Sequence, residues 1–195
     1  MPLSDPLLSS RSLKLAVLGC SLIVAAALGG CDRQSDKAAQ PAPSASAGSV
    51  TSGIDRSKQG SALPDFTLAD PAGAKLALAS LKGKPVLINL WATWCAPCVA
   101  ELPTLDKLAA SGAVRVVTVS QDAAPPQKIA AFLTDMGLTR LPAWLDPDND
   151  LSGHYNTATL PTTVLYDSTG REVWRFVGEH DWGSPQTAAL IAEAR

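Results

Sequence analysis

Two cysteines separated by two residues, Cys95 and Cys98, are the residues of this sequence best suited to chemistry. Disulfide exchange needs one thiolate that attacks a disulfide and a second thiol close enough to release the mixed disulfide that forms. A Cys-x-x-Cys motif at the start of a helix meets both needs, because the free N–H groups and the macrodipole of the first turn stabilise a thiolate. We therefore expect Cys95 to attack and Cys98 to resolve.

The residues around the motif predict a strand before it and a helix after it. Residues 86–91 (VLINLW) are almost continuously apolar, which is typical of a strand buried on both faces. Apolar residues then recur at helical spacing, and Pro97 fits the first helical turn, where its missing N–H is not needed. A strand, a Cys-x-x-Cys motif and a helix in this order indicate a thioredoxin-like redox motif.

A zinc site built on the two cysteines is the main alternative. It would need two further ligands, and the sequence offers His154 and His180, which are far apart and outside any common metal spacing. We therefore expect no metal, and no cofactor besides a redox-active disulfide between Cys95 and Cys98. A copper-binding assembly factor stays open as an alternative if folding brings a histidine beside Cys95.

Residues 91–98 (WATWCAPC) resemble the thioredoxin superfamily, and in this form the TlpA and ResA branch of membrane-anchored bacterial thiol:disulfide oxidoreductases. The resemblance extends from about residue 64 to the end of the chain. Pro103 matches a helix proline of the family, residues 160–162 (LPT) match its cis-proline loop, and Glu101 matches an acidic residue near the active site of ResA-like members. Residues 178–184 (GEHDWGS) resemble a loop of TlpA proteins, which favours that branch.

The resemblance implies an α/β, thioredoxin-like fold with a central mixed β-sheet flanked by helices and an N-terminal β-hairpin. The residue patterns give the same elements. Strands are predicted at 66–68 and 75–78, which flank a turn, and at 114–119, 164–166 and 172–177. Helices are predicted at 122–137, where Gly137 is the stop, and from Ser184, which we expect to be a cap, to the C-terminus.

Several site residues follow from the resemblance. We expect Pro161 to form a cis peptide bond beside the cysteines, and the backbone of Leu160 to pair with a substrate segment. Trp94 and Pro97 are expected to contact the substrate, Trp94 as an exposed aromatic; a packed side chain is the alternative for Trp94. Thioredoxin has a buried acid at the position of Asn89, and an amide cannot accept a proton, so we interpret Glu101 as the replacement. The alternative is that Glu101 is an ordinary solvated helix carboxylate.

The first part of the chain predicts export and attachment. Residues 1–30 have a positive start, an apolar run and small residues, the layout of an export signal. Residues 28–31 (LGGC) resemble the bacterial lipobox, which implies lipidation of Cys31; an uncleaved transmembrane helix and plain secretion are the alternatives. Residues 31–61, rich in Ala, Ser and Pro, predict a flexible tether, and residues 62–195 the folded domain.

Composition and resemblance together define the expected function. A net charge of −2 over 195 residues gives no electrostatic reason to expect nucleic acid. The resemblance implies a reductase on the periplasmic side of the inner membrane, supplied by a membrane electron donor of the DsbD or CcdA type. The exported substrates of this reductase would be proteins with disulfides: a copper chaperone, an oxidase copper subunit or apocytochrome c. We expect a monomer. A thiol peroxidase is a further alternative, although the Pro-x-x-x-Thr arrangement is absent around Cys95.

Overall fold

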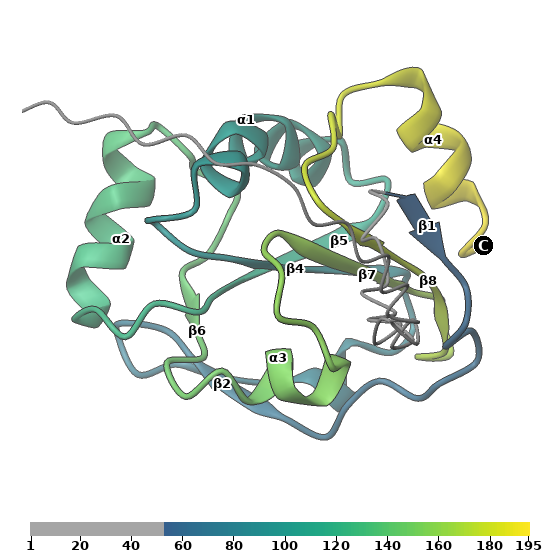
Figure 1. Cartoon of the computed structure of the whole chain (residues 1–195), viewed down its shortest axis with the longest axis horizontal. Coiled ribbons are helices and arrows are strands. Elements are labelled where there is room, and N and C mark those ends of the chain that lie inside the picture. Colours follow the sequence, from purple (N-terminus) through teal and green to yellow (C-terminus); the bar gives the residue numbers. More distant parts are fainter. Residues whose placement is uncertain (1–52) are drawn as a thin grey trace, which may run out of the picture. The chain divides into compact units, whose positions relative to one another are not determined.

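The computed structural model describes residues 53–195, which form one mixed sheet with helices on both faces (Figure 1). The strands are β1 (Gly53–Asp55), β2 (Thr67–Ala69), β3 (Lys75–Ala77), β4 (Val86–Trp91), β5 (Arg115–Ser120), β6 (Trp144–Leu145), β7 (Thr162–Tyr166) and β8 (Glu172–Val177). The helices are the 3-10 helix η1 (Leu78–Leu81), α1 (Ala96–Ser111), α2 (Pro126–Asp135), α3 (Asp150–Tyr155) and α4 (Pro185–Ala192).

The sheet has the strand order β1-β8-β7-β4-β5-β6-β2-β3, with β4 near its middle. β4 pairs parallel with β5 and antiparallel with β7, and all six of its residues are buried. β2 and β3 form the predicted antiparallel hairpin. The expected central mixed sheet, flanking helices and N-terminal hairpin are therefore confirmed.

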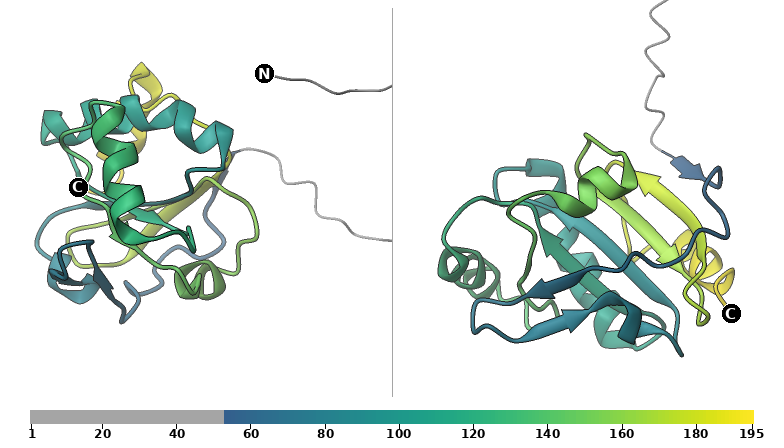
Figure 2. Two further views of the ribbon diagram at one scale, coloured as in Figure 1. Left: turned by 90° about the vertical axis from the view of Figure 1, so that its left-hand side faces the viewer. Right: turned by 90° about the horizontal axis from the view of Figure 1, so that it is seen from below.

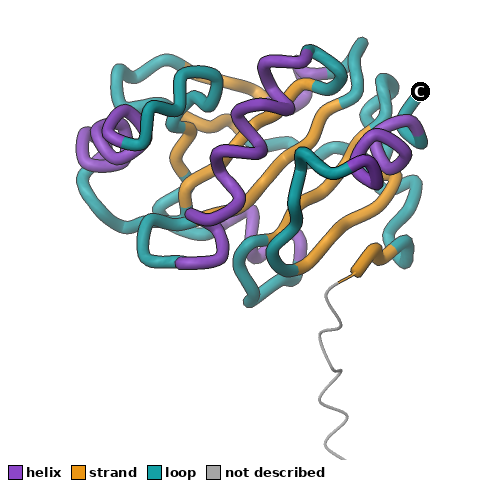
Figure 3. Tube along the Cα trace, turned by 90° about the horizontal axis from the view of Figure 1, so that it is seen from above, coloured by secondary structure: helices purple, strands orange, loops and turns teal. Residues whose placement is uncertain are grey.

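Apolar side chains fill a separate core on each face of the sheet. Leu102 and Leu105 of α1, Ile129 of α2 and Ile191 of α4 belong to one cluster. Leu151 of α3 and residues of η1 belong to the other. Viewed from above, α1 crosses over the strands (Figure 3). Since both faces are covered, the central strand is apolar throughout and does not alternate.

The folded domain begins earlier than residue 62, which corrects the expected end of the tether at residue 61. β1 lies beside β8 at the edge of the sheet (Figure 2). The two strands pair antiparallel, from Gly53 opposite Val177 to Asp55 opposite Arg175. Asp55 accepts hydrogen bonds from the backbone N–H and hydroxyl of Ser57, and Arg56 forms an ion pair with Glu193. β1 has three residues and one large apolar side chain, too few to show the alternation by which a strand is predicted. Its backbone pairing with β8 could therefore not be predicted from the sequence.

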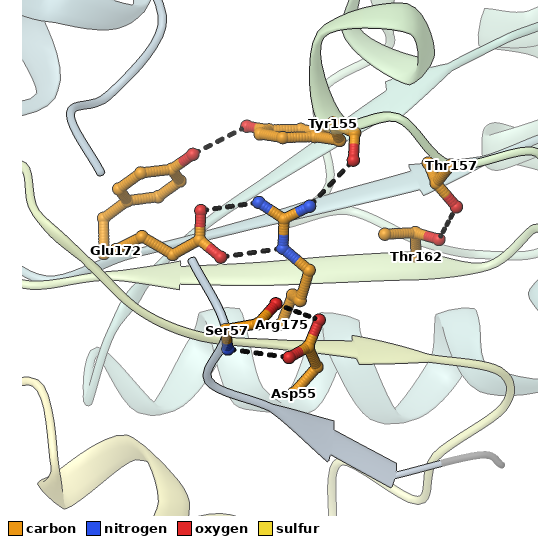
Figure 4. A network of polar contacts seen from close by, with 8 residues as sticks. Asp55, Ser57, Tyr155, Thr157, Thr162, Glu172 and Arg175 are labelled. Carbon is orange, nitrogen blue, oxygen red and sulfur yellow. Dashed lines mark hydrogen bonds and ion pairs between the residues drawn. The ribbon is translucent and has the colours of Figure 1, made fainter. Parts of the chain in front are cut away.

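Opposite β1 in the sheet, two residues of β8 form an ion pair, and one of them also binds the end of α3. The guanidinium of Arg175 donates two hydrogen bonds to Glu172, at 2.7 and 2.8 Å, and one to the carbonyl oxygen of Tyr155 at 2.8 Å (Figure 4). The Glu172 side chain is 1% exposed. All three hydrogen bonds join parts of the domain to one another, so we interpret their role as stabilising the fold.

Two predicted helix boundaries are confirmed only in part. Helix α2 begins at Pro126 and not at residue 122, because Pro125 and Pro126 disfavour a helical conformation in the residue before each and fit only a first turn. The helix ends at Asp135, Met136 is its C-cap, and Gly137 follows with φ +70°, in agreement with the predicted stop at Gly137. Ser184 is the N-cap residue of α4, as predicted, although its hydroxyl contacts Thr187 Oγ1 and makes no capping bond to the backbone.

The predicted export signal, Cys31 and most of the tether lie outside the described residues. Within residues 53–195, no helix has the length and apolar character needed to cross a bilayer. The anchor therefore stays a prediction from the sequence.

Candidate active site

The motif cysteines lie at the N-terminus of α1 and form a disulfide. Cys95 is the N-cap residue, and its Sγ accepts a hydrogen bond from the backbone N–H of Cys98 at 3.3 Å. Pro97 occupies the first turn of the helix, as predicted, and is exposed. Cys95 retains 5% of its exposure and Cys98 none. The sulfur that receives a helix N–H is therefore also the more accessible one, an arrangement that favours a thiolate at Cys95.

Strand register brings the proline loop to the same end of the sheet. Leu90 of β4 is paired with Thr162 of β7, so the residues that follow β4 and those that precede β7 meet there. The Leu160–Pro161 peptide bond is cis, as expected. Leu160 is half-buried and packs against the apolar cluster that contains both cysteines.

Glu101 is buried one helical turn after Cys98. Its carboxylate accepts three hydrogen bonds: from Asn89 Nδ2 at 2.7 Å, from the backbone N–H of His180 at 3.1 Å, and from Trp182 Nε1 at 3.1 Å. The side chain is 2% exposed. The alternative of an ordinary solvated helix carboxylate is therefore wrong.

Burial raises the pKa of Glu101 from 4.5 to about 7, although the hydrogen bonds from His180, Asn89 and Trp182 act in the opposite direction. A carboxyl group that titrates near neutral pH can both accept and return a proton under ordinary conditions. Residues three apart on a helix share one face, with Cβ atoms about 5–6 Å apart. Glu101 therefore lies on the same helix face as Cys98, one turn further along α1.

Asn89 links this carboxylate to β7. Its Nδ2 also donates to Thr163 Oγ1 at 2.9 Å, whereas its Oδ1 is buried without a hydrogen-bond partner in the described part of the chain. If the amide turned over, Oδ1 would face Glu101 and could accept the O–H of the protonated acid. An amide at this position therefore suits both protonation states of Glu101, even though it cannot itself take the proton.

Trp94 is exposed, and the residue before it in the motif loop is hydrogen-bonded to a buried carboxylate. Its side chain is 71% exposed, the largest exposure of any large apolar residue between 53 and 195. The preceding residue, Thr93, donates to Asp122 through its backbone N–H at 2.9 Å and through its hydroxyl at 2.7 Å. Asp122 is 4% exposed and also binds the hydroxyl of Ser120. The motif loop is therefore fixed by a carboxylate at the end of β5.

Sequence reasoning missed Asp122 and the contact of Trp182 with Glu101. A signal for Asp122 existed, because Thr93 follows β4 and Asp122 follows β5, and the carboxyl ends of parallel strands lie at one edge of a sheet. No such signal existed for Trp182, because it is 81 residues away from Glu101 in the chain.

Neither histidine lies in a metal-binding cluster. His154 is exposed and stacks edge-on against Phe66, and the ring of His180 contacts Thr187 Oγ1 at 3.0 Å. In residues 53–195, no three His, Cys, Asp or Glu side chains gather as a metal site would require. The chemistry of the described site is that of a dithiol with a nearby acid.

Comparison with known proteins finds relatives that are thiol-disulfide oxidoreductases. The redoxin family model matches residues 58–191. The thiol-disulfide oxidoreductase ResA of Bacillus subtilis is 36% identical over 129 residues, 64% of this chain and 70% of ResA. ResA of Bacillus anthracis is 34% identical over 122 residues, 62% of this chain and 70% of the relative.

Solved structures agree with this. The exposed lipoprotein thioredoxin of Streptococcus pneumoniae superposes with a TM-score of 0.58 at 27% identity, over 65% of this chain and 99% of that one. A secreted disulfide oxidoreductase of Mycobacterium tuberculosis gives a TM-score of 0.54 at 28% identity, over 67% and 94% of the two chains. The thioredoxin-like fold expected from the sequence is confirmed.

Proposed function

Because the chain belongs to the redoxin family within the thioredoxin superfamily, and is a ResA-like thiol-disulfide oxidoreductase, we propose that it works outside the cytoplasm as a membrane-attached protein-disulfide reductase. One arrangement of two groups at the start of α1 carries the proposed mechanism. Cys95 Sγ accepts a hydrogen bond from the first turn of α1, and a buried carboxyl group that titrates at about pH 7 lies one turn beyond Cys98. The first feature supports a nucleophile and the second a proton acceptor.

The first step is attack by the Cys95 thiolate on a substrate disulfide. A bond forms between Cys95 Sγ and one substrate sulfur, and the substrate S–S bond breaks. The second substrate sulfur leaves as a thiolate and takes a proton from water, which balances the proton that Cys95 released to water when it ionised. Leu160 presents backbone groups beside the cysteines for a substrate strand, and the exposed Trp94 supplies an apolar contact.

The second step releases the substrate. Cys98 gives its proton to the Glu101 carboxylate and attacks Cys95 Sγ, so that the Cys95–Cys98 disulfide forms and the mixed disulfide breaks. The departing substrate thiolate takes a proton, which Glu101 can return. In total the substrate gains two electrons and two protons, and the dithiol is oxidised to the disulfide. A dithiol of a membrane electron donor of the DsbD or CcdA type reverses this oxidation.

The direction of transfer is tested by the reduction potential. Equilibration with glutathione buffers is expected to give a value nearer that of thioredoxin, about −270 mV, than that of DsbA, about −120 mV. A value close to that of DsbA would contradict a reductase.

Changing Glu101 to Gln should remove the pH dependence of substrate release near neutral pH, whereas an unchanged pH profile would exclude Glu101 as the proton acceptor.

For attachment, we propose a lipid on Cys31 at the periplasmic side of the inner membrane. Residues 28–31 supply the lipobox pattern, and one of the structural neighbours is described as an exposed lipoprotein. Radiolabelled palmitate should enter the wild-type chain and not a C31A variant. Retention in membranes without label would indicate the uncleaved transmembrane helix instead.

The proposed substrates are exported proteins of cytochrome assembly: a copper chaperone, an oxidase copper subunit or apocytochrome c. A Cys98→Ser variant cannot resolve the mixed disulfide, so it should accumulate its substrates as covalent complexes in membranes. Mass spectrometry of complexes that form with this variant and not with Cys95→Ala identifies them. Complexes with proteins that have no part in cytochrome assembly would refute this substrate class.

A further inference from the structure

The loop of residues 178–184, between β8 and α4, covers the buried carboxyl group of Glu101. Two of its N–H groups, the backbone N–H of His180 and the indole Nε1–H of Trp182, donate to the same oxygen, Oε2, each at 3.1 Å. The Trp182 side chain is 2% exposed. One oxygen of the proton acceptor is thus bound by a loop that comes from the far end of the chain.

The indole of Trp182 is held in place from two sides. Its backbone N–H donates to Thr104 Oγ1 of α1 at 3.2 Å. Its ring packs edge-on against His180, with centroids 4.6 Å apart, and against Phe176 of β8 at 6.5 Å. The indole N–H is therefore a fixed donor that does not have to be ordered when Glu101 ionises.

We propose that Trp182 is a positioning residue for the exchange reaction, whose indole N–H stabilises the ionised carboxylate of Glu101 and thereby sets the pH at which Glu101 accepts the proton of Cys98. This inference rests on the role proposed above for Glu101. An indole N–H and a backbone N–H are donors only, so neither can accept the O–H of a neutral acid. Both therefore favour the charged form over the neutral one.

The other groups that face Glu101 do not replace this donor. Asn89 of β4 is uncharged and can turn either its donor or its acceptor toward the carboxyl group. On α1 the titratable neighbour is Cys98, one turn earlier, and on the loop the charge of Glu179 opposes ionisation. The ring of His180 contacts Thr187 Oγ1 and not Glu101. Trp182 is the fixed side-chain donor that a single substitution can remove while the aromatic packing is kept.

The test compares two tryptophan-to-phenylalanine substitutions in the full chain, solubilised in detergent. W182F removes the N–H that binds Glu101, and W174F removes an equally buried indole N–H that binds the carbonyl oxygen of Leu190 at 3.2 Å. Carbon-13 NMR of labelled glutamate measures the titration of Glu101 in the oxidised protein, and its resonance is the one of four that is lost in E101Q. We expect W182F to raise the midpoint by about 1 pH unit and W174F to leave it unchanged.

The same shift should appear in the chemistry. The rate at which Cys98 releases a mixed disulfide should keep its pH profile in W174F and move upward by about 1 pH unit in W182F. An unchanged W182F titration, or an equal shift in W174F, would overturn the inference. If E101Q itself kept the pH step, the role proposed for Glu101 would fail instead, so the two failures are distinguishable.

A second variant covers the case in which W182F does not fold. Thr104→Val removes the oxygen that holds the Trp182 backbone and conserves the shape of the side chain. Because the indole is then less firmly placed, we expect an upward shift of the Glu101 midpoint that is smaller than 1 pH unit. A downward shift or no shift in T104V would contradict the positioning role.

Discussion

Replacing Glu101 by glutamine should remove the part of the pH dependence of stability that comes from this carboxyl group. Glutamine has the shape of the protonated acid: its Oε1 can accept from His180 and Trp182, and its Nε2 can donate to Asn89 Oδ1 once that amide has turned. The substitution therefore conserves the packing and removes the buried charge. Burial raises the pKa of Glu101 from 4.5 to about 7, so ionisation of this group costs free energy only in the folded wild type. The free energies of unfolding of the two proteins should therefore differ only above pH 4.5.

The sign of the effect follows from proton binding. Below pH 4.5 the carboxyl group is protonated in both the folded and the unfolded protein, so its contribution to stability is fully present. Between 4.5 and about 7 the folded protein holds a proton that the unfolded protein has lost, so stability falls as the pH rises. At about 1.4 kcal/mol per pH unit, the rise from 4.5 to about 7 corresponds to a total loss of about 3 kcal/mol.

Urea unfolding of the oxidised protein measures this loss. Wild type and E101Q should have similar free energies of unfolding near pH 4, and E101Q should be the more stable by about 3 kcal/mol near pH 8. Asp65→Asn, a change at an exposed carboxylate outside the site, is the control and should follow wild type at every pH. A difference between wild type and E101Q that stays constant from about pH 4 to about pH 8 would refute the assignment of a neutral-range carboxyl group to Glu101.

Three further substitutions test other parts of the structure. Asp122→Asn should cost about 1–3 kcal/mol in urea unfolding and slow disulfide exchange, because an amide cannot accept all the bonds that Thr93 and Ser120 donate; unchanged stability would contradict this anchor. Trp94→Ala should leave stability within about 0.5 kcal/mol but slow the reduction of protein disulfides relative to small ones, and equal slowing of both would argue against substrate contact. Arg175→Met, which leaves Glu172 buried without its partner, should cost about 3–5 kcal/mol, whereas Arg56→Met at the exposed pair should cost less than about 1 kcal/mol; similar losses in both would refute the importance of burial.

Local patterns predicted the elements that carry the cysteines. The apolar run of 86–91, the Cys-x-x-Cys spacing and the proline of 160–162 each act over a few residues, and the structure has the predicted strand, helix start and cis peptide bond there. These features depend on burial of one short segment and on the backbone geometry of proline. Such information is present in the sequence itself.

The contacts that surround Glu101 could not be predicted in the same way. Burial of that side chain depends on the loop that brings in His180 and Trp182, 79 and 81 residues later in the chain. Within α1, Glu101 lies on the face of Cys98 and Leu105, but nothing in the helix itself indicates that a distant loop covers its carboxyl group. Strand β1 shows the same limit, because it is specified by its pairing with β8 and not by a pattern of its own side chains.

Closure of the sheet by β1 has a practical consequence for anyone who shortens this chain. A fragment that starts at residue 62 would uncover one side of β8, which would then offer a row of unpaired N–H and C=O groups to other molecules. It would also lose Arg56, and with it the ion pair to Glu193 near the C-terminus. Self-association of such a fragment should therefore be attributed to the missing edge strand before it is interpreted as a property of the native protein.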